Sequence, residues 1–365
     1  MVLQTTTTIP ERKSAMDESI AWLGLDGHSR QCVLAQLDDE GKERGWWSVP
    51  TTSKALVAAV QAIPQARKRL MLEECELSRW LAGVLRPVVE KLVVCDPREN
   101  HLLSRHHDKR DERDAYTLAR LLRLQEYKEV WQPTDPQRIA FRHAARGYED
   151  AVRHQTRVKQ QIKSQYRQWG VMVTGSEVFN PHKQHRYLKE LPAGARRQVE
   201  VLGQLLKSML DTEKLSRKHL VELGRSFPEV ARLRKVPGIG LIGSNLFVAY
   251  LQDPGRFRSD GQIIRYCQLG IRSRSSDDKP LGYQRLDRSG YGTLKAISYR
   301  AWLTAVRRQR GVVWEFYLES KKRTGSEVNA RLNTQRKVIT TMWRLWLKEA
   351  EFDPKRFLSS QPSEV

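Results

Sequence analysis

The sequence is short of cysteine and of long apolar runs, and each shortage excludes a class of protein. Its four cysteines, Cys32, Cys75, Cys95 and Cys267, are scattered, without a Cys-x-x-Cys pair or a histidine pair at zinc-site spacing. We therefore expect no structural zinc, no disulfide and a reducing compartment such as the cytoplasm. No stretch approaches the ~20 apolar residues of a membrane-spanning helix, so we expect no membrane partner.

The first 17 residues also lack the order of a signal peptide, in which a charged segment precedes an apolar one. They are polar and include four consecutive threonines, so we expect a disordered tail over residues 1–17. We expect a second tail over residues 351–365. With 365 residues in all, the chain between the tails is long enough for two or three domains.

Acidic residues are too few to balance the basic ones. Lysine and arginine number 64 against 42 aspartates and glutamates, which gives a formal net charge of +22. A chain this basic is typical of proteins that neutralise a polyanion, and the phosphate backbone of a nucleic acid is the most common one. The composition therefore predicts binding to DNA or RNA.

Residues 18–131 read as a mixed α/β domain. Short apolar runs, the first two ending in turn-like segments, predict strands, and two longer amphipathic segments predict helices. The expected strands are 20–26, 31–37, 46–49, 70–73 and 91–97, the last closed by Pro97, and the expected helices are 54–63 and 78–85. Hairpins followed by alternating strands and helices indicate a mixed sheet covered by helices.

An acidic helix start follows these strands. Apolar residues recur with helical spacing after Ala115, and Asp111 and Asp114 lie one turn apart on one face of the same helix. Two neighbouring carboxylates repel one another unless a cation lies between them, and carboxylates are the ligands that Mg²⁺ or Mn²⁺ prefers. The alternative is a solvated helix start, where acids are favoured by the helix dipole.

Two further acids end predicted strands. Asp26 follows the first apolar run and Glu73 follows the fourth. Acids at strand ends fall on one edge of a sheet, so we expect Asp26, Glu73, Asp111 and Asp114 to meet there. Four carboxylates suit two divalent ions about 4 Å apart, which clamp the oxygens of a phosphodiester. In a chain of this charge, the set predicts metal-dependent phosphoryl transfer on nucleic acid.

Residues 132–226 predict a helical arm. Two prolines near residue 135 mark a boundary, and two long polar helical stretches, 137–168 and 195–225, favour an antiparallel hairpin or coiled coil over a compact core. Three basic residues of the first stretch are candidates for phosphate contact, although a solvated face is the alternative. They are Arg153, Arg157 and Lys163.

Residues 227–350 predict a mainly helical region. A Pro-Gly-Ile-Gly turn at 237–240 is typical of a helix-hairpin-helix, in which Gly238 and Gly240 would let backbone N–H groups approach a phosphate. The same turn also forms between helices without any ligand. A polar loop follows at 271–279, and the chain is expected to be helical from about residue 295 to 351.

These residues resemble the bacterial insertion-sequence-110 type (DEDD) transposases from about residue 19 to 350. The family's last acid pair lies in Lys-x-Asp-x-x-Asp-Ala, which matches residues 109–115, and its first acid follows an apolar strand as Asp26 does. Glu73 begins the counterpart of its second acidic motif. Pro-Gly-Ile-Gly recurs at 237–240, and a late Arg-Lys pair matches residues 336–337.

The resemblance implies a RuvC-like (RNase H-like) nuclease domain over residues 18–131, a coiled-coil arm over 132–226 and a C-terminal transposase domain over 227–350. It also implies a nucleophilic serine and recombination guided by a structured noncoding (bridge) RNA that pairs with donor and target DNA. A homo-oligomer, dimer or tetramer, with composite active sites is implied as well. Such a protein would work in the bacterial cytoplasm, associated with the nucleoid.

Two departures from the family pattern leave alternatives open. Glu73 is followed by Glu74-Cys75-Glu76 instead of small residues, so Glu74 or Glu76 is a rival metal ligand. The family's Ser-Gly step is Ser276-Asp277 here, which makes Ser276 the first choice of nucleophile and Ser275 its rival. Nearby basic residues that could contact phosphate are Arg272, Arg274 and Lys279.

Two other functions compete with an RNA-guided transposase or recombinase. A stand-alone RuvC-like nuclease or Holliday-junction resolvase would use the four acids and need no serine. A non-catalytic nucleic-acid-binding protein would carry the acids as surface charge. A covalent protein–DNA adduct separates the first hypothesis from both of the others.

Overall fold

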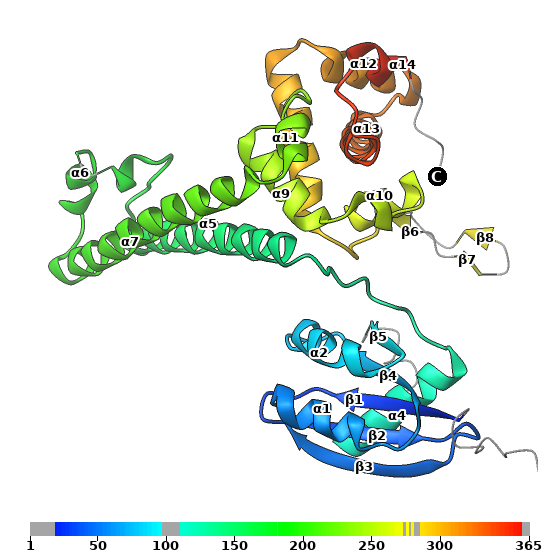
Figure 1. Ribbon diagram of the computed structural model, residues 1–365. Helices are drawn as coiled ribbons and strands as arrows, with labels where there is room; N and C mark the ends of the chain where they lie inside the picture. Colours follow the sequence, from blue (N-terminus) through cyan, green and yellow to red (C-terminus); the bar gives the residue numbers. More distant parts are fainter. Residues whose placement is uncertain are drawn as a thin grey trace, which may run out of the picture. The chain divides into compact units, whose positions relative to one another are not determined.

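The computed structural model describes residues 19–96, 110–180, 182–272, 275–276, 279–280 and 285–359. The chain divides into two compact units, residues 1–132 and 133–365 (Figure 1). The expected tail at 1–17, Lys109 and Arg274 all lie outside the described residues.

A five-stranded mixed sheet forms the centre of the first unit. Its strand order is β3-β2-β1-β4-β5, with β1, β2 and β3 antiparallel and β1, β4 and β5 parallel. The strands are β1 (Ile20–Asp26), β2 (Gln31–Leu37), β3 (Glu43–Pro50), β4 (Arg67–Glu73) and β5 (Lys91–Cys95). This arrangement confirms the expected mixed sheet and is consistent with an RNase H-like domain.

Helices cover both faces of this sheet because the side chains of the buried strands alternate between two cores. Leu23 and Leu25 of β1 face one core, packed with helices α1 (Ser53–Gln61) and α2 (Ser78–Leu85). Trp22 faces the other core, packed with α4 (Asp111–Leu124). A short 3₁₀ helix, η1 (Arg86–Val88), leads into β5.

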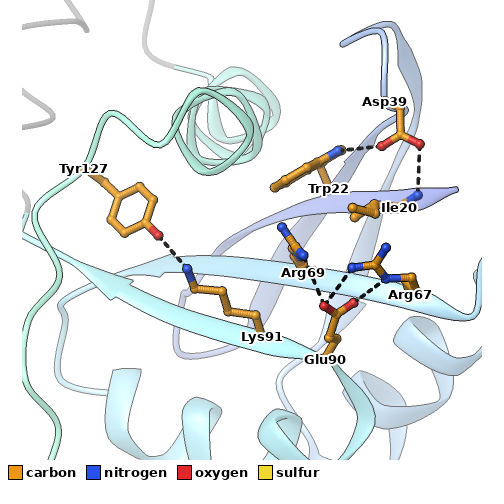
Figure 2. Close-up of polar contacts among 8 residues, drawn as sticks. All are labelled: Ile20, Trp22, Asp39, Arg67, Arg69, Glu90, Lys91 and Tyr127. Atoms are coloured by element: carbon orange, nitrogen blue, oxygen red, sulfur yellow. Dashed lines mark hydrogen bonds and ion pairs between the residues drawn. The ribbon is translucent and has the colours of Figure 1, made fainter. Parts of the chain in front are cut away.

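Ion pairs close the edge of the sheet where β1 and β4 begin. Figure 2 shows Glu90 between Arg67 and Arg69, whose guanidinium groups donate to its carboxylate over 2.9 to 3.1 Å. These bonds lower the pKa of Glu90 to about 2. Beside them, the Trp22 indole N–H donates to Asp39 over 3.1 Å (Figure 2). The charged side chains at this edge are therefore paired with one another and stabilise the sheet.

Two long helices make the arm at the start of the second unit. They are α5 (Pro136–Gln168) and α7 (Ala193–Gly224), which run side by side (Figure 1). Tyr166 and Ala195 share a small core at one end, and Phe141 and Leu220 share a larger core at the other, so the helices are antiparallel as expected. Two short helices complete the tip, η2 (Glu177–Phe179) and α6 (Gln184–Leu188).

The larger core belongs to a helical body that packs on the base of the arm. Its helices are α8 (Pro228–Leu233), α9 (Leu241–Leu251), η3 (Pro254–Arg256), α10 (Asp260–Tyr266), α11 (Gly292–Arg308), α12 (Val312–Thr324), α13 (Glu327–Leu347) and α14 (Pro354–Ser359). The expected tail from residue 351 is wrong in its first part, because Phe357 of α14 is only 2% exposed. Its ring packs against Phe316 and Phe352.

Candidate active site

Two of the predicted acids lie at one edge of the sheet. Asp26 is the last residue of β1 and Glu73 the last of β4, and the residues before them, Leu25 and Leu72, pair in the parallel ladder. Both leucines belong to the core under α1 and α2. Because side chains alternate along a strand, the acids that follow turn toward the opposite face, which α4 covers.

A glycine brings α4 close to this edge. A Cβ on Gly24 would lie 1.9 Å from the carbonyl oxygen of Ala115 and 2.7 Å from the amide nitrogen of Ala119. The backbone of α4 therefore rests directly on β1, at a position that no larger residue could occupy. This contact holds the first turn of α4, which carries Asp111 and Asp114, beside the end of β1.

The charges of these acids act on one another. Burial raises the pKa of Asp26 above its ordinary value of 3.8, His28 opposes that rise, and the carboxylates of Asp111 and Asp114 add to it. The side chain of Asp26 is 16% exposed, whereas that of Asp111 is 54% exposed. Three carboxylates that repel one another in a partly buried corner make a site that a cation would stabilise.

His28 is a member of this group that the sequence reasoning missed. Its Nε2 lies 3.1 Å from Oδ2 of Asp26 and 3.7 Å from Oδ1 of Asp111. The Asp-x-His spacing directly after a predicted strand was the available signal. It was overlooked because a single histidine in a polar turn has many ordinary explanations.

The rival acids differ from Glu73 in their surroundings. Glu74 and Glu76 are exposed, and the backbone N–H of Glu74 donates to the carbonyl of Cys95 over 3.0 Å. Glu74 follows Glu73 by one residue, so the alternation that turns Glu73 toward α4 turns Glu74 away from it. Glu73 itself is half-buried. The backbone register therefore favours Glu73 as the acid that belongs with Asp26.

The donor set fits a divalent metal ion. Asp26, His28 and Asp111 each offer one ligand atom, and these atoms all lie within 4.8 Å of one another. Carboxylate oxygens are hard ligands suited to Mg²⁺ and Mn²⁺, and imidazole nitrogen accepts transition-metal ions. Asp114 and Glu73, on the same helix turn and sheet edge, could complete the coordination.

The serine region has a different local structure from the one expected. At its described residues the predicted polar loop is wrong, because two short antiparallel ladders form there, β6 (Ile271–Arg272) with β9 (Arg285–Leu286) and β7 (Ser275–Ser276) with β8 (Lys279–Pro280). Ser276 pairs with Lys279. Backbone pairing between residues of a nominal loop explains why side-chain pattern alone did not reveal it.

Contacts beside the β6–β9 ladder fix it to the helical body. The Gln268 side-chain amide donates to the carbonyls of Arg288 and Gly290 over 2.8 and 2.9 Å. The backbone N–H of Tyr291 donates to the Tyr266 carbonyl over 2.8 Å. The guanidinium of Arg336, from the late Arg-Lys pair, donates to the Leu269 carbonyl over 3.0 Å. Both strands thus leave the body from defined positions.

Two arginines lie opposite one another in the β6–β9 ladder. Arg272 pairs with Arg285 in the β6–β9 register, and both are exposed. Like charges directly opposite in an antiparallel pair destabilise the ladder when nothing neutralises them. The negative charge of Asp287 acts on Arg272, so part of this repulsion is offset within the chain.

The Pro-Gly-Ile-Gly turn joins α8 to α9 as expected. Gly238 has φ +83°, and a Cβ on it would lie 2.8 Å from the Cα of Ala301 in α11. Packing of the turn against α11 therefore accounts for Gly238 without a ligand. Gly240 precedes the first turn of α9 and has open space beside it.

The three basic arm residues have different environments. Arg157 is exposed, whereas Arg153 forms an ion pair with Asp150. The ammonium of Lys163 lies 5.6 Å from the centre of the Phe179 ring, so part of its role is to pack the arm tip. Of the three, Arg157 is exposed without an ion pair or ring contact described above, so its guanidinium is the most accessible to a phosphate backbone.

An acid-lined edge of a mixed sheet, in a strongly basic chain with a helical second unit, is typical of metal-dependent enzymes that act on nucleic-acid phosphodiesters. Comparison with known proteins gives the family. One family model of DEDD transposases, described as Transposase, matches residues 23–169. A second, described as Transposase IS116/IS110/IS902 family, matches residues 230–318. The chain belongs to the IS110 family of transposases.

A relative among known proteins agrees with this assignment. A protein of Sinorhizobium fredii (strain NBRC 101917 / NGR234) named "Putative transposase y4qE" is 24% identical over 288 residues, which cover 77% of this chain and 72% of that protein. The family implies DNA substrates, cutting and joining of DNA, and a divalent metal. Within the part of the chain that the structure describes, no helix has the length and apolarity to cross a membrane.

Proposed function

We propose that the protein is an RNA-guided DNA transposase or recombinase of a bacterial insertion sequence, which cuts and rejoins strands with an acidic tetrad and a serine nucleophile. The observation that carries this proposal is the meeting of Asp26, Asp111 and Asp114 at the edge of the sheet where Glu73 also ends its strand. The helix dipole favours Asp111 and Asp114 at the start of α4, and their closeness to the partly buried Asp26 adds a carboxylate that a cation would neutralise.

The acids act as the ligands of Mg²⁺ or Mn²⁺. When bound, the metal lowers the pKa of an attacking group and stabilises charge on the phosphodiester oxygens. Asp26, whose side chain is 16% exposed, would hold the ion from β1, and Asp111, which is 54% exposed, would hold it from α4. Glu73 and Asp114 flank them. The glycine contact at the α4–β1 crossing keeps this arrangement rigid.

Ser276 supplies the nucleophile. Its Oγ forms a bond to phosphorus while the phosphorus–oxygen bond to the departing strand end breaks, the hydroxyl proton passes to a base, and the leaving oxygen takes up a proton. Reversal of the same step by another strand end rejoins the DNA and frees the serine. Arg272, with Arg274 and Lys279, stabilises the negative charge on the phosphate oxygens.

A bridge RNA and further copies of the chain complete the proposal. The family resemblance supports guidance by a noncoding RNA and a dimer or tetramer with composite sites, each formed by the acids of one subunit and the serine of another. The basic arm, with Arg157 exposed, and the basic hairpin offer surfaces for these polyanions. Since the substrates are chromosomal and element DNA, we place the action at the nucleoid.

The experiment that tests the proposal is capture of a denaturation-resistant protein–DNA adduct in the presence of Mg²⁺ and of the RNA that copurifies with the chain, identified by sequencing. We expect Ser276→Ala to remove the adduct while folding and RNA binding survive, since only one oxygen is lost. Asp111→Asn and Asp114→Asn should also abolish cleavage. Glu112→Gln, on the same helix turn but outside the cluster, is the matched control and should remain active.

The outcomes separate the competing functions. Loss of the adduct in Ser275→Ala instead of Ser276→Ala would shift the nucleophile by one residue. Metal-dependent cleavage without any adduct in the wild type would favour a stand-alone nuclease. Full activity of both aspartate variants would show that the tetrad is misassigned, and the absence of any specific RNA would remove RNA guidance from the proposal.

A further inference from the structure

We propose that His28 is a direct ligand of the catalytic metal ion, and that its imidazole makes the site select Mn²⁺, or a similar transition-metal ion, over Mg²⁺. The inference deepens the proposed metal-dependent function and rests on it. It concerns a residue that lies outside the acidic tetrad and inside the same corner of the sheet.

The distances from His28 to the two carboxylates lie within the range that a shared octahedral site requires. With metal–ligand bonds of about 2.1 Å, neighbouring ligand atoms lie about 3.0 Å apart and opposite ones about 4.2 Å apart. Nε2 of His28 lies 3.1 Å from Oδ2 of Asp26 and 3.7 Å from Oδ1 of Asp111. Small rotations of exposed side chains would bring all three donors onto one ion.

The backbone of His28 is held in place, and its half-exposed ring contacts Asp26. The Thr51 hydroxyl donates to the His28 carbonyl over 2.7 Å, and the Cys32 thiol lies 3.8 Å from the same oxygen. The side chain is 50% exposed. His28 is therefore anchored at the start of the turn after β1, with a ring that can exchange its bond to Asp26 for a bond to a metal.

Ligand chemistry sets the expected selectivity. Mg²⁺ prefers oxygen ligands and retains several of its waters, so a nitrogen donor adds little to its binding. Transition-metal ions accept imidazole nitrogen together with carboxylates. As a ligand, His28 would give the lone pair of Nε2 and carry its proton on Nδ1. Loss of the ring should therefore weaken Mn²⁺ binding much more than Mg²⁺ binding.

The test is electron paramagnetic resonance of Mn²⁺ bound to the full-length chain freed of nucleic acid. Pulsed measurements detect the ¹⁴N of a coordinated imidazole, and titration of the free Mn²⁺ signal gives the affinity. We expect a ¹⁴N signal in the wild type, its loss in His28→Ala and His28→Asn, and a fall in Mn²⁺ affinity of about tenfold or more. Competition with Mg²⁺ should show a much smaller change in Mg²⁺ affinity.

Two control variants make the result decisive. Ser29→Ala changes the next residue of the same turn, and His219→Asn removes an exposed histidine of α7 in the other unit. Both should keep the ¹⁴N signal and the affinity of the wild type. A wild-type Mn²⁺ site without the ¹⁴N signal, or a His28→Ala variant with equal or higher Mn²⁺ affinity, would overturn the inference.

The same titration distinguishes failure of this inference from failure of the proposed function. If Asp26→Asn and Asp111→Asn abolish Mn²⁺ binding while His28→Ala leaves it unchanged, the acidic site stands and the histidine ligand is wrong. If those two acid variants bind Mn²⁺ as the wild type does, the metal site itself is misplaced, and the proposed function fails with the inference.

Discussion

Gly24 shows how much of the candidate site depends on one missing side chain. The residue has no titratable group and touches no substrate in the proposed mechanism, yet it determines how closely α4 approaches β1. Both helix residues above it, Ala115 and Ala119, are alanines that are fully buried. Small residues on both sides of the crossing bring the Asp111 turn within reach of Asp26.

Gly24→Ala should therefore damage both stability and metal binding. Its new methyl would collide with backbone atoms of α4, which cannot turn aside as a side chain would. We expect a loss of about 3 kcal/mol or more, the upper part of the usual range for overpacking, measured by denaturant unfolding. Gly83→Ala is the matched control, since Gly83 lies in helix α2 with open space beside it and should gain up to about 1 kcal/mol.

Measuring both stability and Mn²⁺ affinity of Gly24→Ala separates a displaced α4 from general unfolding. A displaced α4 should weaken Mn²⁺ binding even at temperatures where the variant remains folded. Unchanged stability together with unchanged Mn²⁺ affinity in Gly24→Ala would show that the crossing has room to adjust and does not control the site.

At the scale of elements, the strands and helices of the first unit follow from sequence because their burial is simple. Runs such as residues 20–26 are apolar almost throughout because helices cover both faces of the sheet, and a short continuous apolar run is a recognisable strand signal. Asp26 and Glu73 could be placed at a common sheet edge for the same reason. The histidine beside them could not, since its role depends on the distance between β1 and α4, and no pattern within either segment encodes that distance.

Two elements of the second unit were missed for other physical reasons. The β6–β9 and β7–β8 ladders join strands of two residues each, which are too short for apolar alternation to be read from the sequence. Helix α14 has only six residues, and it is stabilised by burying Phe357 against α12 and α13 side chains far back in the chain. Short elements gain their stability from tertiary contacts instead of from local propensity.

The Glu90 ion-pair group gives an element-scale prediction, because it ties β4 to the segment that enters β5. Its lowered pKa means that the folded state favours the charged carboxylate. The stabilisation is fully present above the ordinary pKa of 4.5 and is lost as pH falls from there to about 2. Glu90→Gln should lower Tm at pH 7, and the difference from wild type should shrink between pH 4.5 and 2.

Thermal melts of the two full-length proteins across that pH range provide the measurement. Glu126→Gln, an exposed acid just after α4, serves as the control and should show a small difference that changes little with pH. A Glu90→Gln difference that stays constant from pH 7 to pH 2 would mean that the group stabilises the sheet by packing and not by charge.

At the scale of the whole molecule, the excess of basic residues predicts strongly salt-dependent binding to nucleic acid. Each phosphate neutralised on duplex DNA contributes a slope of about −0.9 in a plot of log affinity against log salt. With a formal charge of +22, we expect a steep slope, measured by fluorescence anisotropy between low and moderate salt. Arg157→Gln and Arg272→Gln should each make the slope shallower by about 0.9, which is the contribution of one phosphate contact.

A matched arginine outside the proposed surfaces completes that measurement. Arg67→Gln removes a charge that is already engaged with Glu90, so it should leave the salt slope unchanged. A flat salt response in the wild type would show that the basic excess serves a purpose other than contact with a polyanion.

The length of the arm determines how far its tip moves when its base turns. Helix α5 has 33 residues, so at about 1.5 Å per residue it is about 50 Å long, close to the length of fifteen base pairs. Separate apolar cores fix its two ends, one at the tip and one in the helical body. The helix therefore sets a fixed distance between the two cores and moves as a rigid rod. A turn of only about 10° at its base would carry the tip through about 9 Å, enough to exchange one phosphate for the next along a strand.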